Sequence, residues 1–174
     1  MAIYFTIYSF FGYFLESFYI SLIERKWVSS GLLKGPFIPL YGFASLILIL
    51  LSSYISPSFL SFFSCGIIMT LLEYITSLFI EKVFHQKCWD YSHLFCNYQG
   101  RICLFYFIIW CGLSYIFITW IHPFISSFIP LNDFSYLIAF ICIVYLIKTF
   151  IDKLNQSQEK GLITKKEKKT ISSI

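Results

Sequence analysis

Two glutamates lie inside long apolar windows of the sequence, and their carboxyl groups are the first candidates for chemistry. Glu16 lies in "YSFFGYFLESFYISLI" (8–23) and Glu73 in "CGIIMTLLEYITSLFI" (65–80). A charge near the centre of a bilayer costs at least about 2.5–3.5 kcal/mol, so such residues usually face a protein interior or a water-filled cavity. We therefore expect both acids to lie on inward-turned faces and to serve a task performed from the cytoplasmic side.

Each glutamate shares a helical face with small and polar residues, because these residues recur at intervals of three, four and seven. The first stripe is Ser9, Gly12, Tyr13 and Glu16, and the second is Gly66, Thr70, Glu73 and Ser77. Small and polar stripes are typical of helix–helix interfaces in lipid. The segments "ESFYISLIER" (16–25) and "EYITSLFIEK" (73–82) also match in pattern. They predict equal depth, about 12 Å above the cytoplasmic boundary, and a weak internal repeat.

The composition indicates which class of protein carries these acids. Apolar residues make up 58% of the 174 residues and charged residues only 13%, whereas soluble domains carry about 25% charged residues. Apolar windows of about 18 residues or more predict membrane spans. The N-terminal window lacks a basic segment before it and a small-residue cleavage site, so we read it as an uncleaved first span. The sequence therefore predicts an integral membrane protein and excludes a soluble domain.

We expect an all-α, polytopic fold with five transmembrane helices, at about 3–23, 37–55, 59–80, 102–121 and 134–151. With this count all 13 Lys and Arg residues fall on one side, and the positive-inside rule places the N-terminus outside and the C-terminus in the cytoplasm. The chain then divides into a membrane domain (1–151) and a polar, basic cytoplasmic tail (152–174). The net charge of +4 follows from this orientation, and nothing indicates a nucleic-acid partner.

One long polar passage, "KCWDYSHLFCNYQGR" (87–101), interrupts the apolar chain. We expect it to fold back on the bundle as a cytoplasmic gate or docking element that supplies partners for the buried acids, Arg101 among them. Asp90 could pair with Arg101 or contact another subunit, and Asn97 could cap a turn. A purely structural role in ordering the loop stays open. So does a zinc site built from two His-x-x-Cys pairs that begin at His85 and His93.

Three stretches carry a resemblance to a known family: "RKWVSSGLLKGPFIPLYG", "LLEYITSLFIEKVF" and "WDYSHLFCNYQGRICL". They resemble the type IV ABC-transporter permease family of small bacterial membrane proteins, over about residues 5–120. The resemblance implies that the entry and loop motifs hold the functional positions. Together with the acids Glu16 and Glu73 these are Gly35, Pro36, Pro39, Tyr41, Gly42, Trp89, Asp90, Tyr91, Ser92, Asn97, Gly100 and Arg101.

The function predicted from this resemblance is a permease-like subunit in the cell membrane. The sequence has no Gly-x-x-x-x-Gly-Lys-[Ser/Thr] phosphate loop, so ATP hydrolysis would need a separate cytoplasmic subunit. Five spans are few for a solute path, which favours a homo-oligomer or hetero-complex in contact with membrane lipid. No catalytic constellation, cofactor or metal is expected. Two alternatives stay open: a helper or assembly subunit of a membrane complex, and an intramembrane enzyme acting on lipid head groups.

Overall fold

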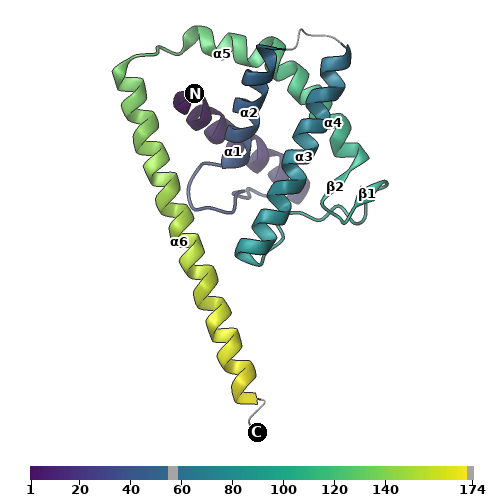
Figure 1. The fold of residues 1–174 in the computed structure, drawn as a ribbon, viewed down its shortest axis with the longest axis vertical. Coiled ribbons are helices and arrows are strands. Elements are labelled where there is room, and N and C mark those ends of the chain that lie inside the picture. The colour runs from purple at the N-terminus through teal and green to yellow at the C-terminus, as the bar shows by residue number, and fades with distance from the viewer. Residues whose placement is uncertain (55–58, 172–174) are drawn as a thin grey trace.

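A computed structural model describes the backbone of residues 1–54 and 59–171 and the side chains of residues 1–54 and 60–159. Helices dominate this part of the chain (Figure 1) and confirm the all-α class. They are α1 (Ala2–Glu24), α2 (Pro39–Ser52), α3 (Phe59–Phe84), α4 (Leu104–Ile116), a π-helical turn η1 (Phe117–Ile121), α5 (His122–Phe128) and α6 (Asp133–Ile171). A short antiparallel hairpin, β1 (Asn97–Tyr98) and β2 (Ile102–Cys103), precedes α4.

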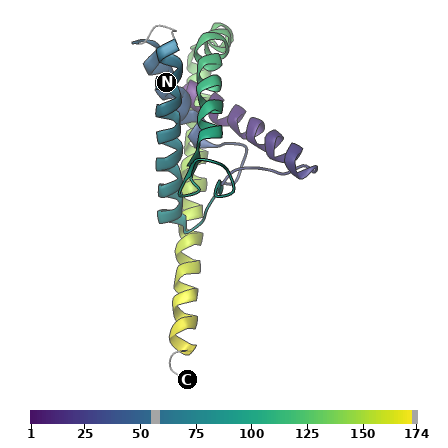
Figure 2. The ribbon, with the colours of Figure 1, turned by 90° about the vertical axis from the view of Figure 1, so that its right-hand side faces the viewer.

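Three helical segments of the described chain are long and apolar enough to cross a membrane: Leu60–Phe84, Leu104–Phe128 and Asp133–Glu159. Helix α2 has 14 residues, which is about 21 Å at 1.5 Å per residue and shorter than the hydrocarbon core. Helix α1 is long enough but carries Tyr, Ser, Thr and Glu among its apolar residues. It leaves the bundle at a steep angle to α3 and α6 (Figure 2). The five-span topology therefore stays a prediction.

Several helix boundaries differ from the approximate limits of the predicted spans, which themselves stay predictions. The expected span at 37–55 is a helix only over Pro39–Ser52, where the proline fits the first helical turn because its missing N–H needs no partner there. The connection expected at 122–133 is helical as far as Phe128. Pro123 is the second residue after the π-helical turn η1, and such turns relieve the backbone where a proline cannot supply its hydrogen bond. The last predicted span and the described part of the basic tail form one helix, α6 (Asp133–Ile171), and residues 172–174 of the tail lie outside the described residues.

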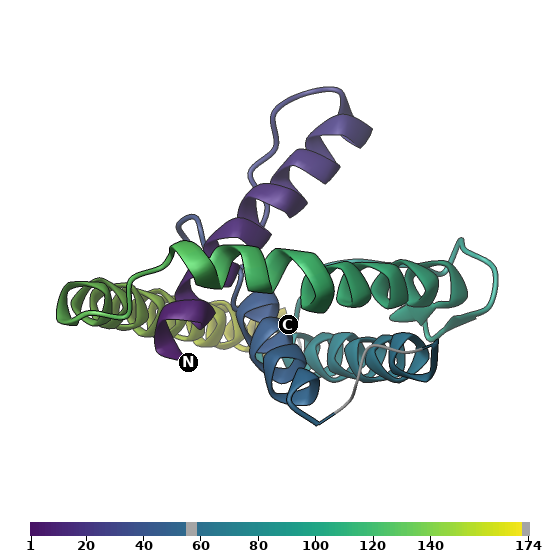
Figure 3. The same cartoon turned by 90° about the horizontal axis from the view of Figure 1, so that it is seen from above.

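Close helix pairs organise the bundle: α1 packs along α2, and α3 packs along α4 (Figure 3). Glycines make the approach possible. A Cβ on Gly42 would lie 2.2 Å from Ser9 Oγ, and a Cβ on Gly66 would lie 2.0 Å from Cys111 Sγ. Both contacts belong to the small and polar stripes found in the sequence, so these stripes face neighbouring helices.

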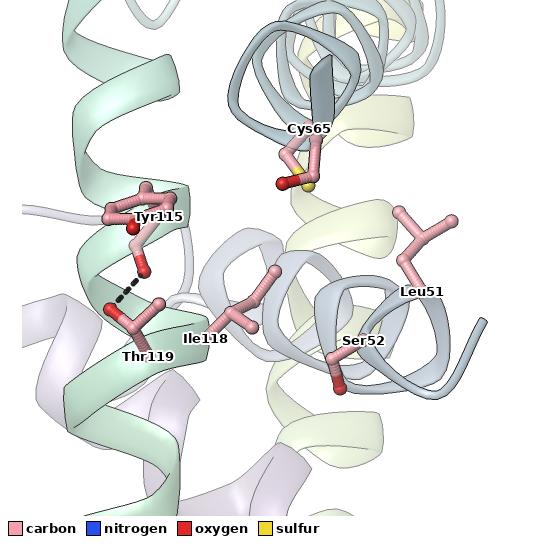
Figure 4. A pocket seen from close by; sticks show the side chains of 7 residues that line it. Leu51, Ser52, Cys65, Tyr115, Ile118 and Thr119 are labelled. Carbon is pink, nitrogen blue, oxygen red and sulfur yellow. Dashed lines mark hydrogen bonds between the residues drawn. The ribbon is translucent and has the colours of Figure 1, made fainter. Parts of the chain in front are cut away.

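The apolar core lies where α2, α3 and α4 meet, around Ala44, Leu48, Cys65 and Met69. A cavity of about 10 Å³ lies beside Cys65, between Leu51 of α2 and Tyr115 of α4 (Figure 4). That volume is about the space of one water molecule. The core is therefore well filled and offers no ligand site there.

Helix α6 packs against α1 and α3 and extends beyond the other helices towards the C-terminus (Figure 1). Its Phe150 ring stacks on Phe79 and lies edge-on to Phe84. Its Tyr145 hydroxyl donates to the Lys34 carbonyl oxygen at 3.1 Å. These contacts place α6 against the loop that connects α1 and α2.

Candidate functional site

Glu73 lies in the middle of α3 and is one of the most buried polar residues, with 4% of its surface exposed. The Tyr91 hydroxyl donates to its Oε1 at 2.9 Å, and the Trp110 indole N–H donates to its Oε2 at 3.0 Å. Each carboxyl oxygen therefore has a donor, as a buried carboxyl group requires. One donor comes from the polar passage and the other from α4, so a single side chain joins the loop to two helices.

Tyr91 connects this carboxyl group to α1 as well. Burial and the neighbouring Glu73 raise the pKa of Tyr91, so its hydroxyl keeps the proton that it donates. The Tyr91 ring stacks on Tyr106 of α4, with the ring centroids 4.4 Å apart. The Tyr106 hydroxyl in turn lies 2.7 Å from the Tyr19 hydroxyl of α1. The chain of contacts thus runs from α3 through the loop and α4 to α1.

Glu16, the second acid, is half-buried in α1. The Ser30 hydroxyl donates to its Oε1 at 2.6 Å, and the Tyr41 side chain of α2 also hydrogen-bonds it. Tyr41 interacts electrostatically with Glu73 too, and its ring lies tilted against Trp110 at a centroid distance of 6.3 Å. Tyr41 therefore connects the surroundings of the two acids.

The Tyr41 ring packs directly against Gly12. A side chain at position 12 would clash with it, because a Cβ there would lie 2.3 Å from the Tyr41 ring. Further along the entry motif, Pro39 opens α2 and Pro36 lies in the preceding loop. Gly35 has a φ of +107° and lies directly against the Tyr145 ring, where any side chain would be strained and would clash. The entry motif therefore sets the approach of α2 and α6 to α1.

The loop between α1 and α2 is held against α1 by serines. Ser17 Oγ accepts the backbone N–H of Ser30 at 3.0 Å, and Ser21 Oγ accepts that of Val28 at 2.9 Å. Helix α1 ends at Arg25, whose φ is +53°, and the chain turns back from there. These bonds fix the Ser30 hydroxyl beside Glu16.

The polar passage is ordered mainly by its own residues. The Trp89 indole N–H donates to the Arg101 carbonyl oxygen at 2.9 Å, and the Tyr91 N–H donates to the Gly100 carbonyl oxygen at 2.8 Å. Asp90 Oδ1 accepts the Ser92 N–H at 2.9 Å. That hydrogen bond lowers the pKa of the Asp90 carboxyl group, which stays ionised near neutral pH.

Asn97 closes the other half of the loop. Its side-chain amide donates to the Ser92 and Leu94 carbonyl oxygens, and its Oδ1 accepts the Gly100 N–H at 3.1 Å. Gly100 has a φ of +67° and faces Asp90, so a side chain there would be strained. These contacts give the loop motif a structural role, with Tyr91 as the member that reaches a buried acid.

Arg101 does not partner the buried acids, and of the two possibilities left open for Asp90 the pair with Arg101 does not form. Its guanidinium group lies 2.5 Å from Glu81 Oε2 and donates to Ser77 Oγ at 3.0 Å. Asp90 uses its carboxylate within the loop. Arg101 therefore fastens the loop to the last turns of α3.

The zinc alternative finds no support in the described part of the chain. No group of three or more His, Cys, Asp or Glu side chains there is arranged to hold a metal ion. All six cysteines are described, and all are free thiols.

Sequence reasoning missed Tyr19, Ser30, Tyr106 and Trp110. These residues do not stand out in a chain with 21 Phe, 13 Tyr and 4 Trp. A signal was nonetheless present, because Tyr and Trp carry a polar group that must find a partner when it is buried in an apolar environment. Tyr and Trp are therefore the residues to search for when a buried acid lacks an evident base.

The chain matches the family described as "Putative ABC-transporter type IV" over residues 3–154. It belongs to this family. The ABC-transporter type IV match extends past the resemblance seen at about 5–120 and includes most of the apolar part of α6. It identifies a transporter-associated membrane protein. No curated protein and no solved structure matches the chain significantly.

Proposed function

We propose that the chain is the permease-like membrane subunit of a transporter and works with a separate ATPase that docks from the cytoplasm. Family membership and three helices able to span a membrane support the membrane role. Residues 1–174 hold no phosphate loop, which supports an ATPase separate from this membrane domain. Five membrane-embedded helices, with the N-terminus outside and the C-terminus in the cytoplasm, agree with the placement of all Lys and Arg on one side.

The observation that carries this proposal is the hydrogen bond from Tyr91 to Glu73. Tyr91 belongs to the polar passage, which lies on the basic side of the proposed topology, whereas Glu73 lies within a membrane helix. A partner that moves the polar passage therefore acts directly on α3, through the hydrogen bond between Tyr91 and Glu73. It also pulls on α1, through the Tyr91–Tyr106 stack and the Tyr106–Tyr19 contact.

Two exposed aromatic side chains in the polar passage offer a contact surface to that partner. Phe95 is 83% exposed and Tyr98 is 57% exposed. Exposed aromatics of this kind are enriched at protein–protein interfaces. Trp89 and Asp90 hold the loop in shape, so their substitution would weaken docking indirectly, through the loop fold.

Co-purification of the tagged chain from native membranes tests the proposal. We expect a phosphate-loop ATPase subunit to be recovered with the wild type, and Phe95→Ala to reduce its recovery. Phe128→Ala is the matched control, because Phe128 is also an exposed phenylalanine (71%) but lies in α5, away from the loop. Recovery of a membrane complex without any ATPase would favour the assembly-subunit alternative. Purified chain that modifies a lipid without ATP or a partner would favour the enzyme.

A further inference from the structure

A large cleft is lined by residues of α1, the α1–α2 loop, α2, α3, the start of the polar passage and α6. Its volume is about 1030 Å³, which is at the upper end of the range for ligand pockets. Most of its wall is apolar, with Phe43 from α2, Phe79 from α3 and Leu146, Ile147 and Phe150 from α6. A wall of this composition, in a chain with membrane-spanning helices, suits an acyl chain.

Charged groups of both signs line the same cleft. Glu16 contributes a carboxyl group from α1, while Lys87 and Lys153 contribute ammonium groups from the polar passage and from α6. Cys88, which also lines the cleft, lies within electrostatic range of both Glu16 and Lys153. The acid and this base therefore both act on the same part of the cleft wall, at Cys88.

Neither Glu16 nor Lys153 has a counter-charge within the described chain, where the ion pairs are Lys26–Glu24 and Arg101–Glu81. The hydrogen-bond partners of Glu16 are neutral hydroxyl groups, those of Ser30 and Tyr41. These hydrogen bonds offset part of the cost of a half-buried charge in an apolar setting, but no opposite charge among the described residues forms an ion pair with it. The cleft thus presents an acid, Glu16, and a base, Lys153, that are both outside the ion pairs of the described chain, next to an apolar wall.

We propose that this cleft binds one zwitterionic phospholipid with a primary ammonium head group. The ammonium group lies against Glu16, the phosphate lies against Lys153 and Lys87, and an acyl chain follows the wall formed by α3 and α6. An anionic lipid would leave Glu16 without a cation. A quaternary ammonium head group would offer Glu16 no N–H donor. This proposal needs no ATPase partner and stands apart from the proposed function.

Native mass spectrometry of the purified chain, with lipids supplied in equal amounts, tests the proposal. The probes are phosphatidylethanolamine, phosphatidylcholine and phosphatidylglycerol with identical acyl chains. We expect one bound phosphatidylethanolamine, with a preference over phosphatidylcholine of about tenfold or more, because the N–H hydrogen bond to a charged carboxylate is worth about 1.5 kcal/mol or more. Glu16→Gln should remove this preference, whereas Asp152→Asn should keep it, because Asp152 is an exposed acid on α6 outside the cleft.

Substitution of the lysines is the second part of the mass spectrometry test. Lys153→Gln should weaken binding of all three phospholipids, whereas Lys148→Gln should not, because Lys148 does not line the cleft. Equal binding of phosphatidylethanolamine and phosphatidylcholine to the wild type would overturn the proposal. A preference for phosphatidylglycerol would also overturn it.

Thiol labelling of the wild type tests the site without any substitution. Cys88 and Cys96 are both exposed, but only Cys88 lines the cleft. Phosphatidylethanolamine should slow the reaction of Cys88 with a bulky maleimide several-fold relative to phosphatidylcholine, and Cys96 should react equally in both lipids. Equal labelling of Cys88 in the two lipids would contradict the site even if the Glu16 variant failed to fold.

Discussion

Substitution of Glu73 tests the central hydrogen bonds of the site. The Trp110 indole can only donate, whereas the Tyr91 hydroxyl can donate or accept. Glu73→Gln can therefore turn its carbonyl oxygen to Trp110 and its amide N–H to Tyr91, and both hydrogen bonds persist. Leu has about the same size as Glu but no polar group. In Glu73→Leu, the two donors that lie 2.9 and 3.0 Å from a carboxyl oxygen in the wild type are therefore left without a partner.

The expected losses of stability follow from these contacts. Each buried polar group left unpaired costs about 1–3 kcal/mol, so Glu73→Leu should lower the free energy of unfolding by about 2–6 kcal/mol. Glu73→Gln should lower it by less than about 1 kcal/mol, because no donor is left unpaired. In the Glu73→Leu background, Trp110→Phe should recover part of the loss, because it removes one of the unpaired donors.

Unfolding by sodium dodecyl sulfate in mixed micelles, followed by far-ultraviolet circular dichroism, measures these differences. Tyr91→Phe serves as an independent probe and should cost about 1–3 kcal/mol alone, and much less once Glu73 is Leu. Equal losses in the free energy of unfolding for Glu73→Gln and Glu73→Leu would contradict the hydrogen-bonded arrangement. So would a double variant, Glu73→Leu with Tyr91→Phe, whose loss equals the sum of the two single losses.

Two further predictions concern packing and pH. Gly66→Leu should lower the free energy of unfolding by about 1–3 kcal/mol by overpacking against Cys111, whereas Gly112→Leu should be nearly neutral, since nothing lies within 4 Å of a Cβ there; the same unfolding assay compares them. Because the folded state lowers the Asp90 pKa, its contribution is fully present above the unfolded value of about 4 and is lost as pH falls through the lower folded value. The protection of the Ser92 amide from hydrogen exchange, relative to its intrinsic rate at each pH, should therefore stay high at pH 5 and fall in stronger acid, and Asp90→Ala should make the protection low at both.

Much of the fold could be predicted because it depends on local patterns. Long apolar windows predicted the helices, and small or polar residues at helical spacing predicted which faces pack together, as Gly42 against Ser9 and Gly66 against Cys111 show. Boundaries were harder where several local effects compete. Pro123 did not end a helix at 121, because the π-helical turn accommodates it.

The partners of the acids could not be predicted from local pattern. Sequence reasoning named Arg101 as a partner of the acids, but its side chain is bound by Glu81 on the same helix as Glu73. The actual donors, Tyr91 and Trp110, come from segments 18 and 37 residues away. Only the packing of the loop and α4 on α3 brings these donors to Glu73. Because the donors are neutral, no charge pattern in the sequence predicts the contact.

The matching segments around Glu16 and Glu73 suggest equivalent roles, yet the two carboxyl groups have different surroundings. Glu73 is closed off, because a donor from the loop and a donor from α4 occupy its two oxygens. Glu16 is half-buried, is held by hydroxyl groups and lines the cleft beside Lys153. A Gln at either position keeps hydrogen bonds and so should spare folding, and the loss of the negative charge should affect binding only at Glu16, where we propose that the charge has a ligand. Glu16→Gln should therefore change lipid preference and leave docking of a cytoplasmic partner intact, because the loop that we propose for docking is fastened through Glu73.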